Sequence, residues 1–186
     1  MKRIQRLEKR LFDVVFAIVG LIVTFVPSCI IALLIILDTS GPPLFKQFRV
    51  GRHGNLFQCI KFRTMYSESE KRGTVTSASD NRITPIGRFL RKYKLDEIPQ
   101  LWNVLVGNMS IVGPRPDVPG YVDLLKGNDR RMLELYPGIT GPATLRFRFE
   151  EELLAQVNNP QRYNDEVIFP EKVRLNLEYL EHWSFW

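Results

Sequence analysis

The longest apolar run of the chain lies near its start, over residues 11–37, and reads LFDVVFAIVGLIVTFVPSCIIALLIIL. As one helix this run is about 40 Å long, against a bilayer hydrocarbon core of about 30 Å, so it predicts a membrane helix rather than a buried core helix. Pro27 lies within the run. Because proline has no N–H for the carbonyl four residues earlier and its ring crowds that carbonyl, we expect a kink near Pro27.

Basic residues flank the apolar run on both sides. They are Lys2, Arg3, Arg6, Lys9 and Arg10 before it, and Lys46, Arg49, Arg52, Lys61 and Arg63 after it. Lys and Arg close to a membrane segment are retained on the cytoplasmic side of the membrane. A helix that spans the bilayer would leave one of the two sets on the far side. The pattern therefore favours a re-entrant helix, which enters and leaves on the cytoplasmic face, over a spanning helix.

The chain after the apolar run begins with strand patterns and continues with helix patterns. Residues 44–50 and 56–65 flank a glycine-containing turn, which predicts a β-hairpin. Apolar residues at i, i+3, i+4 and i+7 predict a helix over residues 85–94. The residues of its apolar face are Ile86, Phe89, Leu90 and Tyr93. A second amphipathic helix is expected to begin with Asp96 as its N-cap and to end before Gly107.

Shorter patterns fill the second half of the chain. Helices are expected over residues 118–125, 130–135 and 171–183, turns over 111–116 and 137–141, and a loop or short surface helix over 67–82. The aromatic end, residues 183–186, suits a membrane interface. The predicted fold class is α+β and mostly helical, with a re-entrant membrane helix kinked near Pro27, a small β-hairpin, and interfacial amphipathic helices around the active site.

Length and charge narrow the class of protein. A chain of 186 residues without low-complexity tracts predicts one domain over residues 1–186, with 11–37 in the membrane and 44–186 cytosolic at the membrane interface. The net charge of +6 favours anionic partners, and nucleic acid, phospholipid headgroups and phosphorylated small molecules all remain open. Two cysteines and two histidines without metal-ligand spacing give no pattern for a zinc site or a disulfide framework.

Asp96 and Glu97 form an acid pair that follows a run of basic residues. A helix N-cap explains such a pair without any chemistry, because carboxylates accept hydrogen bonds from free N–H groups at helix starts. A carboxylate can instead attack phosphorus if cations and a divalent metal offset the repulsion between the two anions. Glu97 can hold Mg²⁺, which usually takes one or two carboxylates and completes its shell with phosphate and water. Candidate cations are Lys61, Arg63, Arg91 and Arg115.

Lys61 and Arg63 alternate along the second predicted strand and should therefore lie on one face, about 7 Å apart. This spacing suits two phosphate groups. A solvated basic face without a ligand is the alternative interpretation.

Four motifs in this order resemble the monotopic phosphoglycosyl transferases, also called bacterial sugar transferases. They are KFRTM at 61–65, LDEIPQLWNV at 95–104, MSIVGPRP at 109–116 and PGITG at 137–141. The resemblance implies transfer of a sugar phosphate from a nucleotide-sugar, usually a UDP-sugar, to polyprenol (undecaprenyl) phosphate, with release of UMP. It also implies a location on the cytoplasmic face of the bacterial inner membrane. The implied partners are these two substrates and membrane phospholipid, without nucleic acid.

The resemblance also assigns roles to individual residues. Asp96 would be the nucleophile that forms a covalent phosphosugar enzyme, and Glu97 would bind Mg²⁺. The basic residues that would line the phosphate and nucleotide site are Lys61, Arg91, Arg115 and Arg148. Arg146 is the alternative to Arg148, because the family's Asn-Gly-Arg loop is replaced here by PATLRFRF. Family members often continue past this chain's end by another helix, which leaves open whether the chain is truncated at Trp186.

Two other functions stay open on the sequence alone. A non-catalytic module that binds membrane surfaces or nucleic acid would account for the positive charge, but not for an acid pair among the bases. A metal-dependent pyrophosphatase would use the same acids to activate water. No motif specifies the sugar, the glycan pathway or the oligomeric state.

Overall fold

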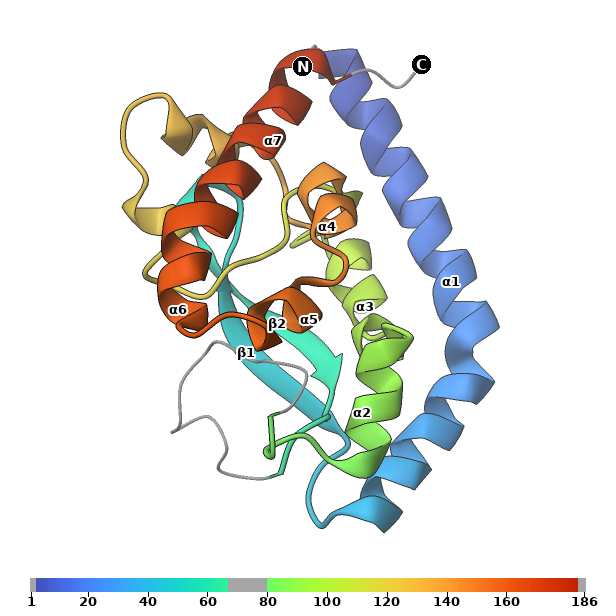
Figure 1. The fold of residues 1–186 in the computed structure, drawn as a ribbon. Coiled ribbons are helices and arrows are strands. Elements are labelled where there is room, and N and C mark those ends of the chain that lie inside the picture. The colour runs from blue at the N-terminus through green and yellow to red at the C-terminus, as the bar shows by residue number, and fades with distance from the viewer. Residues whose placement is uncertain (1–2, 67–79, 184–186) are drawn as a thin grey trace.

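The structure is a computed structural model that describes residues 3–66 and 80–183 (Figure 1). Two predicted segments fall mostly outside these residues. They are the loop over 67–82, of which 67–79 lie outside, and the aromatic end over 183–186, of which 184–186 lie outside. The described part is mostly helical, with a small antiparallel β-hairpin, as the sequence predicts. A long helix runs along one side of the molecule in Figure 1.

Helix α1 (Arg3–Asp38) contains the whole apolar run and is long and apolar enough to cross a membrane. It is one continuous helix with Pro27 inside it, and Figure 1 shows it bending part-way without turning back on itself. The hydroxyl of Thr24 donates to the carbonyl of Gly20 at 2.6 Å, a bond that also favours bending. The bend agrees with the predicted kink. The re-entrant path through a bilayer stays a prediction.

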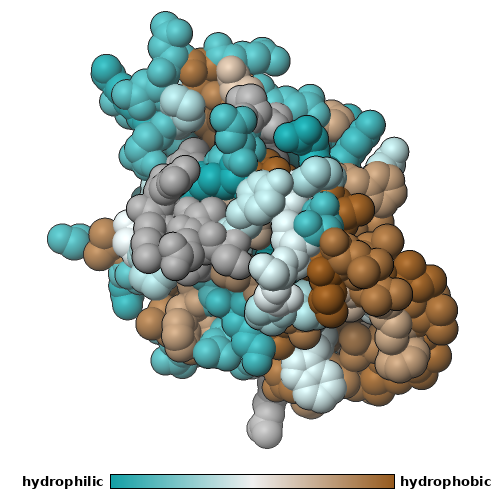
Figure 2. Space-filling view, turned by 90° about the horizontal axis from the view of Figure 1, so that it is seen from below, coloured by the Kyte–Doolittle hydropathy of each residue, from teal (hydrophilic) through white to brown (hydrophobic). Residues whose placement is uncertain are grey.

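Most of α1 has no protein neighbour. Its large apolar side chains are exposed along nearly its whole length, while Ala17, Ile31 and Ile35 are buried against the rest of the protein. Figure 2 shows these apolar residues gathered on one side of the molecule, with hydrophilic residues on the other. This distribution is typical of a protein that faces lipid on one side.

The hairpin consists of β1 (Leu44–Val50) and β2 (Leu56–Phe62), paired antiparallel with Gln47 opposite Cys59. The strand predicted over 56–65 ends three residues early, and Met65 forms only an isolated bridge with Ile83. The turn η1 (Arg52–Gly54) contains His53 at φ 59 and Gly54 at φ 84. The hairpin is thus confirmed, with a shorter second strand.

Helix α2 (Pro85–Lys92) begins at the N-cap Thr84, whose hydroxyl accepts from the N–H of Gly87 at 2.9 Å. The prediction that its apolar residues form one buried face is only half correct. Leu90 is buried, but Phe89 and Tyr93 are exposed and contact each other with ring centroids 4.9 Å apart. Two exposed aromatic rings in contact on a surface helix suit a membrane interface, because such rings prefer the headgroup level.

The second predicted helix starts later than expected. Residues Leu95–Glu97 form a short 3-10 turn, η3, and α3 (Gln100–Leu105) follows it with Pro99 at the N-cap position. Asp96 therefore does not cap α3, and that prediction was wrong. The chain enters η3 through Lys94 in the left-handed conformation at φ 56, which separates the acid pair from α2.

A short parallel pair joins β3 (Ser110–Val112) to β4 (Gly138–Thr140), inside a segment predicted as a turn. Glycine permits this pairing, since a Cβ on Gly113 would lie 2.2 Å from the carbonyl oxygen of Tyr136 and one on Gly138 would lie 2.2 Å from the backbone nitrogen of Gly113. Strand β4 could not be anticipated, because the close approach joins residues about 25 positions apart.

The C-terminal part is a series of short helices followed by one longer helix. The predicted helices over 118–125 and 130–135 contain only the 3-10 turns η4 (Val122–Leu124) and η5 (Asp129–Glu134). The sequence did not predict α4 (Pro142–Arg146), α5 (Glu150–Ala155), α6 (Pro160–Tyr163) or the π-turn η6 (Asn164–Ile168). Helix α7 (Phe169–His182) confirms the last predicted helix.

Candidate active site

Glu97 is a buried carboxylate held by two cations from different parts of the chain. Its Oε1 accepts from Lys61 Nζ of β2 at 3.0 Å and from Arg115 Nη2, in the loop after β3, at 2.6 Å. Burial pushes the pKa of Glu97 upward, but the charges of Arg115 and Lys61 outweigh it and hold that pKa well below its usual range. Glu97 is therefore anionic at any physiological pH.

Asp96, its neighbour, is buried without such partners. Its Oδ1 is shielded from solvent and has no hydrogen-bond partner among the described residues. Burial raises the pKa of Asp96, and the negative charge of Glu97 raises it further, while the nearby charges of Lys61 and Arg91 lower it. Adjacent acids thus sit in opposite environments, one neutralised by cations and one with an oxygen free to react.

Packing around η3 explains how the chain presents these two acids. Leu95 and Ile98, on either side of the pair, pack against the buried cluster that contains Phe62 and Leu90. Burying both neighbours turns Asp96 and Glu97 toward β2 instead. Hydrophobic side chains before and after the pair therefore fix its direction.

Asn103 fastens α3 to the hairpin on the other side of the site. Its Nδ2 donates to the carbonyl of Gln58 at 2.7 Å, and its Oδ1 accepts from the N–H of Ile60 at 3.0 Å. This side chain thus supplies hydrogen-bond partners to the backbone at the unpaired edge of β2, the strand that carries Lys61. Its only sequence signal is a polar residue within an apolar helix face, and the sequence analysis missed it.

The proline-flanked turn holds Arg115 as the sequence predicts. The N–H of Gly113 donates to the carbonyl of Thr140 at 2.8 Å, and the N–H of Gly138 donates to the carbonyl of Pro114 at 2.7 Å. These bonds and the two prolines fix the backbone on both sides of the arginine. Motifs about 25 residues apart are therefore assembled into one support for the Arg115–Glu97 ion pair.

Arg63 does not join this cluster. Its buried guanidinium donates to three successive carbonyls just after α1, those of Thr39, Ser40 and Gly41, at 2.7, 2.5 and 3.3 Å. Arg63 therefore bonds to the backbone after α1 and not to the acid pair, and its assignment to substrate phosphate stays a prediction. Arg63 follows the last residue of β2, so strand alternation does not determine which carbonyls its long side chain reaches.

The remaining predicted basic residues, Arg91, Arg148 and Arg146, differ in their relation to the acid pair. The positive charge of Arg91 acts on Asp96, which fits the predicted site. Arg148 is exposed and lies 4.7 Å from the ring of Phe149, and Arg146 is exposed as well. Among the described residues, no hydrogen bond or ion pair joins either arginine to the acid pair. A nucleotide role for Arg148 or Arg146 stays a prediction.

Charged residues that the sequence analysis did not select extend the cluster behind Arg115. Arg49 donates to the carbonyl of Pro116 at 3.1 Å, and burial lowers its pKa. Burial also raises the pKa of Asp117, against the charges of Lys172 and Arg49. The position of Asp117 directly after the rigid turn is the signal that could have identified it.

Metal binding at the acid pair would need oxygen atoms from elsewhere. Within residues 3–66 and 80–183, no group of three or more His, Cys, Asp and Glu side chains could hold a metal ion. Asp96 and Glu97 nevertheless offer two buried carboxylates, and Asp96 Oδ1 lacks a partner. Because Mg²⁺ is often held by one or two carboxylates together with substrate phosphates, these residues fit magnesium that arrives with a phosphate ligand.

Residues 4–186 match the sequence profile of a family described as bacterial sugar transferase. The UDP-glucose:undecaprenyl-phosphate glucose-1-phosphate transferase of Escherichia coli is 39% identical, over 98% of this chain and 38% of its own length. The protein of the same name from Caulobacter vibrioides is 36% identical, over 97% of this chain and 65% of its own length. A Bacillus subtilis protein named uncharacterized sugar transferase EpsL is 37% identical, over 95% of this chain and 79% of its own length. The chain thus spans less than two thirds of the first two relatives and most of the third. With nearly its whole length matched, this chain belongs to the bacterial sugar transferase family.

Proposed function

We propose that this protein is a sugar-1-phosphate transferase that moves a sugar phosphate from a UDP-sugar to undecaprenyl phosphate and releases UMP. The observation that carries the proposal is Asp96, a buried acid with a free oxygen beside the cation-paired Glu97. Two relatives named as undecaprenyl-phosphate glucose-1-phosphate transferases support the two substrate classes. In this role the enzyme begins bacterial glycan assembly at the membrane.

In the first step, a carboxylate oxygen of Asp96 attacks the phosphorus that carries the sugar. A bond forms between that oxygen and phosphorus, the bond from phosphorus to the bridging oxygen breaks, and UMP leaves with the electron pair. Lys61 and Arg115 lie beside the acids and can offset the charge that develops on the phosphoryl oxygens. In the second step, a phosphate oxygen of undecaprenyl phosphate attacks the same phosphorus and releases Asp96.

The surrounding residues serve this chemistry in distinct ways. Glu97 would hold magnesium together with the substrate phosphates, and the bound ion would supply further positive charge at the pyrophosphate. Arg91 keeps more of Asp96 ionised by placing a positive charge near it. Burial of the pair excludes water, which would otherwise hydrolyse the phosphosugar enzyme.

The reaction can be tested with the full chain purified in detergent or nanodiscs. We expect UMP when the protein receives magnesium, undecaprenyl phosphate and the correct member of a UDP-sugar panel, and a phosphosugar adduct on Asp96 when the lipid is left out. Free sugar phosphate made without lipid would instead identify a pyrophosphatase. Turnover of no UDP-sugar, together with salt-sensitive binding to DNA, would favour a nucleic-acid-binding module.

We also propose that residues 1–186 form one domain whose helix α1 is re-entrant, with residues 44–186 on the cytoplasmic face of the inner membrane. Basic residues on both flanks of the apolar run support this topology. Gln5→Cys and Gln47→Cys can be introduced singly after Cys29 and Cys59 have been replaced. Both should react only from the cytoplasmic side, and labelling from opposite sides would establish a spanning helix.

A further inference from the structure

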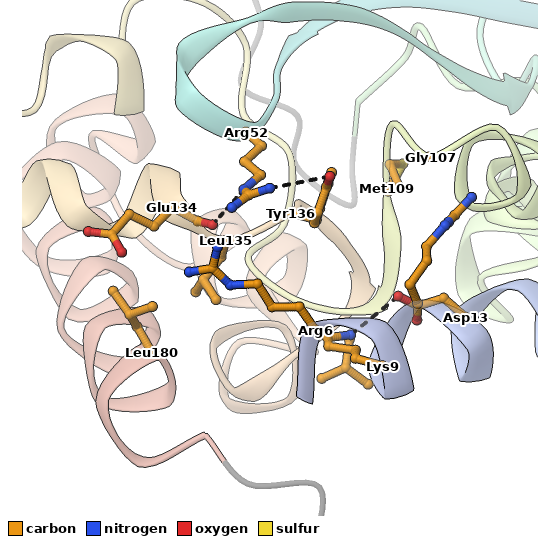
Figure 3. Close-up of a pocket in the computed structure, with 12 residues that line it drawn as sticks. Arg6, Lys9, Asp13, Arg52, Gly107, Met109, Glu134, Leu135, Tyr136 and Leu180 are labelled. Atoms are coloured by element: carbon orange, nitrogen blue, oxygen red, sulfur yellow. Dashed lines mark hydrogen bonds and ion pairs between the residues drawn. The ribbon is translucent and has the colours of Figure 1, made fainter. Parts of the chain in front are cut away.

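A cavity of about 90 Å³ lies where the first turns of α1 meet the end of α7 (Figure 3). The catalytic residues Asp96, Glu97, Lys61 and Arg115 do not line it. Four of its lining residues are basic, and they are Arg6, Lys9, Arg10 and Arg52. Two acids, Asp13 and Glu134, also line it, so the formal charges leave an excess of positive charge in a small space.

Two of the four cations are used by the fold itself. Lys9 forms an ion pair with Asp13 at 3.5 Å and hydrogen bonds to the hydroxyl of Ser110. Arg10 donates to the carbonyls of Val104 and Leu105 at 2.6 and 2.8 Å, which satisfies the end of α3. Neither side chain needs a ligand to account for its position.

Arg52 is a cation held in place with its charge unpaired. Its Nε donates to the carbonyl of Glu134 at 2.9 Å, its Nη1 donates to the hydroxyl of Tyr136 at 3.3 Å, and the guanidinium lies 4.8 Å from that ring. These partners are neutral, and the carboxylate of Glu134 points away from the arginine in Figure 3. Glu134 instead lies 4.0 Å from Arg131. The guanidinium is therefore fixed in orientation, with no acidic side chain in an ion pair with it within residues 3–66 and 80–183.

Arg6 reaches into the same space from α1. Figure 3 shows its side chain extending past Lys9 toward Leu135 and Arg52. Among the described residues, no acidic side chain forms an ion pair with Arg6. Two guanidinium groups that face one cavity without a carboxylate between them favour a ligand with several acceptor oxygens, and phosphate matches their planar donor geometry.

The size of the cavity and the residues around it indicate which class of phosphate compound it could bind. The cavity volume of about 90 Å³ leaves room for a phosphate group. Leu135 and Leu180 form part of the wall. On α1, Leu7 and Leu11 are exposed close to Arg6 and continue the apolar surface of the helix. A phosphate bound here would have hydrocarbon beside it.

We propose that this cavity binds the phosphate of an anionic phospholipid through Arg6 and Arg52. The lipid would join the start of the membrane helix to the turn of the β-hairpin, because the two arginines belong to α1 and η1. Anionic lipid would then fix α1 against the catalytic part of the protein. This site is independent of the proposed reaction, since it shares none of the residues assigned to it.

The test measures binding of short-chain phosphatidylglycerol to the full chain in uncharged detergent. Arg6→Gln and Arg52→Gln together should weaken binding roughly tenfold or more, because each removes a charge-assisted contact to phosphate. Arg52→Lys keeps the charge but loses the planar fork, so its affinity should lie between those of the wild type and Arg52→Gln. Arg174→Gln is the matched control: it removes one exposed arginine of α7, which pairs with Glu171, and should leave binding unchanged.

Four results would overturn this site. Phosphatidylcholine that binds as tightly as phosphatidylglycerol would mean that charge is not recognised, and equal weakening by Arg174→Gln would mean that only net charge matters. Inorganic phosphate that displaces the lipid at equal concentration would identify a free phosphate site. If Arg52→Gln fails to fold, the exposed Arg6→Gln alone decides the outcome, and unchanged lipid affinity in that variant would equally overturn the proposal.

Discussion

Two regions of the molecule bury an aspartate to a similar extent and treat it in opposite ways. Asp13 on α1 is 4% exposed, and it accepts from the N–H of Ile111 at 2.9 Å, the hydroxyl of Ser110 at 3.1 Å and Lys9 at 3.5 Å. Asp96 is 7% exposed, and its Oδ1 has no partner among the described residues. Burial is therefore common to both sites, and hydrogen-bond satisfaction separates them.

This difference indicates what each acid does for the protein. A buried carboxylate with its donors in place stabilises the structure, and Asp13 fastens the membrane helix to β3, which leads directly to Arg115. A buried oxygen without a donor costs free energy, so its retention needs another reason. At Asp96 we propose that the reason is nucleophilic attack, which requires an oxygen that no other group occupies.

The largest expected effect comes from Asp96→Asn. The amide cannot act as the nucleophile, so UMP release should fall by about a thousandfold or more. The thermal midpoint should stay the same or rise, because the change removes the charge of a poorly satisfied carboxylate. Steady-state UMP release and thermal unfolding measure the two quantities. UMP release within tenfold of the wild type would rule out Asp96 as the nucleophile.

Asp13→Ala should have its main effect on stability. The change leaves the N–H of Ile111 and the charge of Lys9 without their acceptor, while the hydroxyl of Ser110 can still donate to the carbonyl of Val112 at 3.0 Å. The loss should cost about 3 kcal/mol. Denaturant unfolding in a fixed detergent measures this loss. Asp96→Ala is the matched control and should lose little stability. Equal losses in the two variants would show that hydrogen-bond satisfaction does not separate the sites.

The acid limb of the pH–rate profile for UMP release should report Asp96. Burial raises the pKa of Asp96, and because the nucleophile must be ionised, activity should fall as the pH drops through this raised pKa. The loss should thus begin above the ordinary aspartate value of about 3.9. Glu97 should not contribute, because Arg115 and Lys61 hold its pKa well below this range despite burial.

Arg91→Gln sharpens that assignment. Since the charge of Arg91 lowers the pKa of Asp96, its removal should move the acid limb of the pH–rate profile to higher pH. Arg88→Gln, an exposed arginine on the same helix, is the control and should leave the limb in place. A limb that stays put in Arg91→Gln would assign the titration to another group.

Local patterns explain why parts of the fold could be predicted. The apolar run, the hairpin and α7 follow from neighbouring residues, so periodicity and turn chemistry were enough to find them. The pairing of β3 with β4 depends on close backbone contact between Gly113 and Gly138, which no local pattern records. Three-residue strands are also too short to show alternation.

The candidate site shows the same division. Lys61, Asp96, Glu97 and Arg115 lie in short motifs, and the structure brings them together. Arg63 lies apart from them, because a strand pattern does not show which carbonyls a long side chain reaches. In the sequence Asp13 is only a charged residue inside an apolar run. Its hydrogen-bond donors Ser110 and Ile111 lie about 100 residues further along the chain, so no local pattern reveals its role.

The same conservative change at both aspartates gives the smallest and most discriminating prediction. In Asp13→Asn the side-chain oxygen can still accept from the N–H of Ile111 and the hydroxyl of Ser110, and only the charge facing Lys9 is lost. Because that ion pair is 3.5 Å long, the expected cost is about 1 kcal/mol in unfolding free energy, with UMP release within about threefold of the wild type. Asp96→Asn should show the reverse, with activity lost and stability kept. If Asp13→Asn lost activity while remaining as stable as the wild type, Asp13 would act in the reaction itself, and a full set of hydrogen bonds would not mark a structural acid.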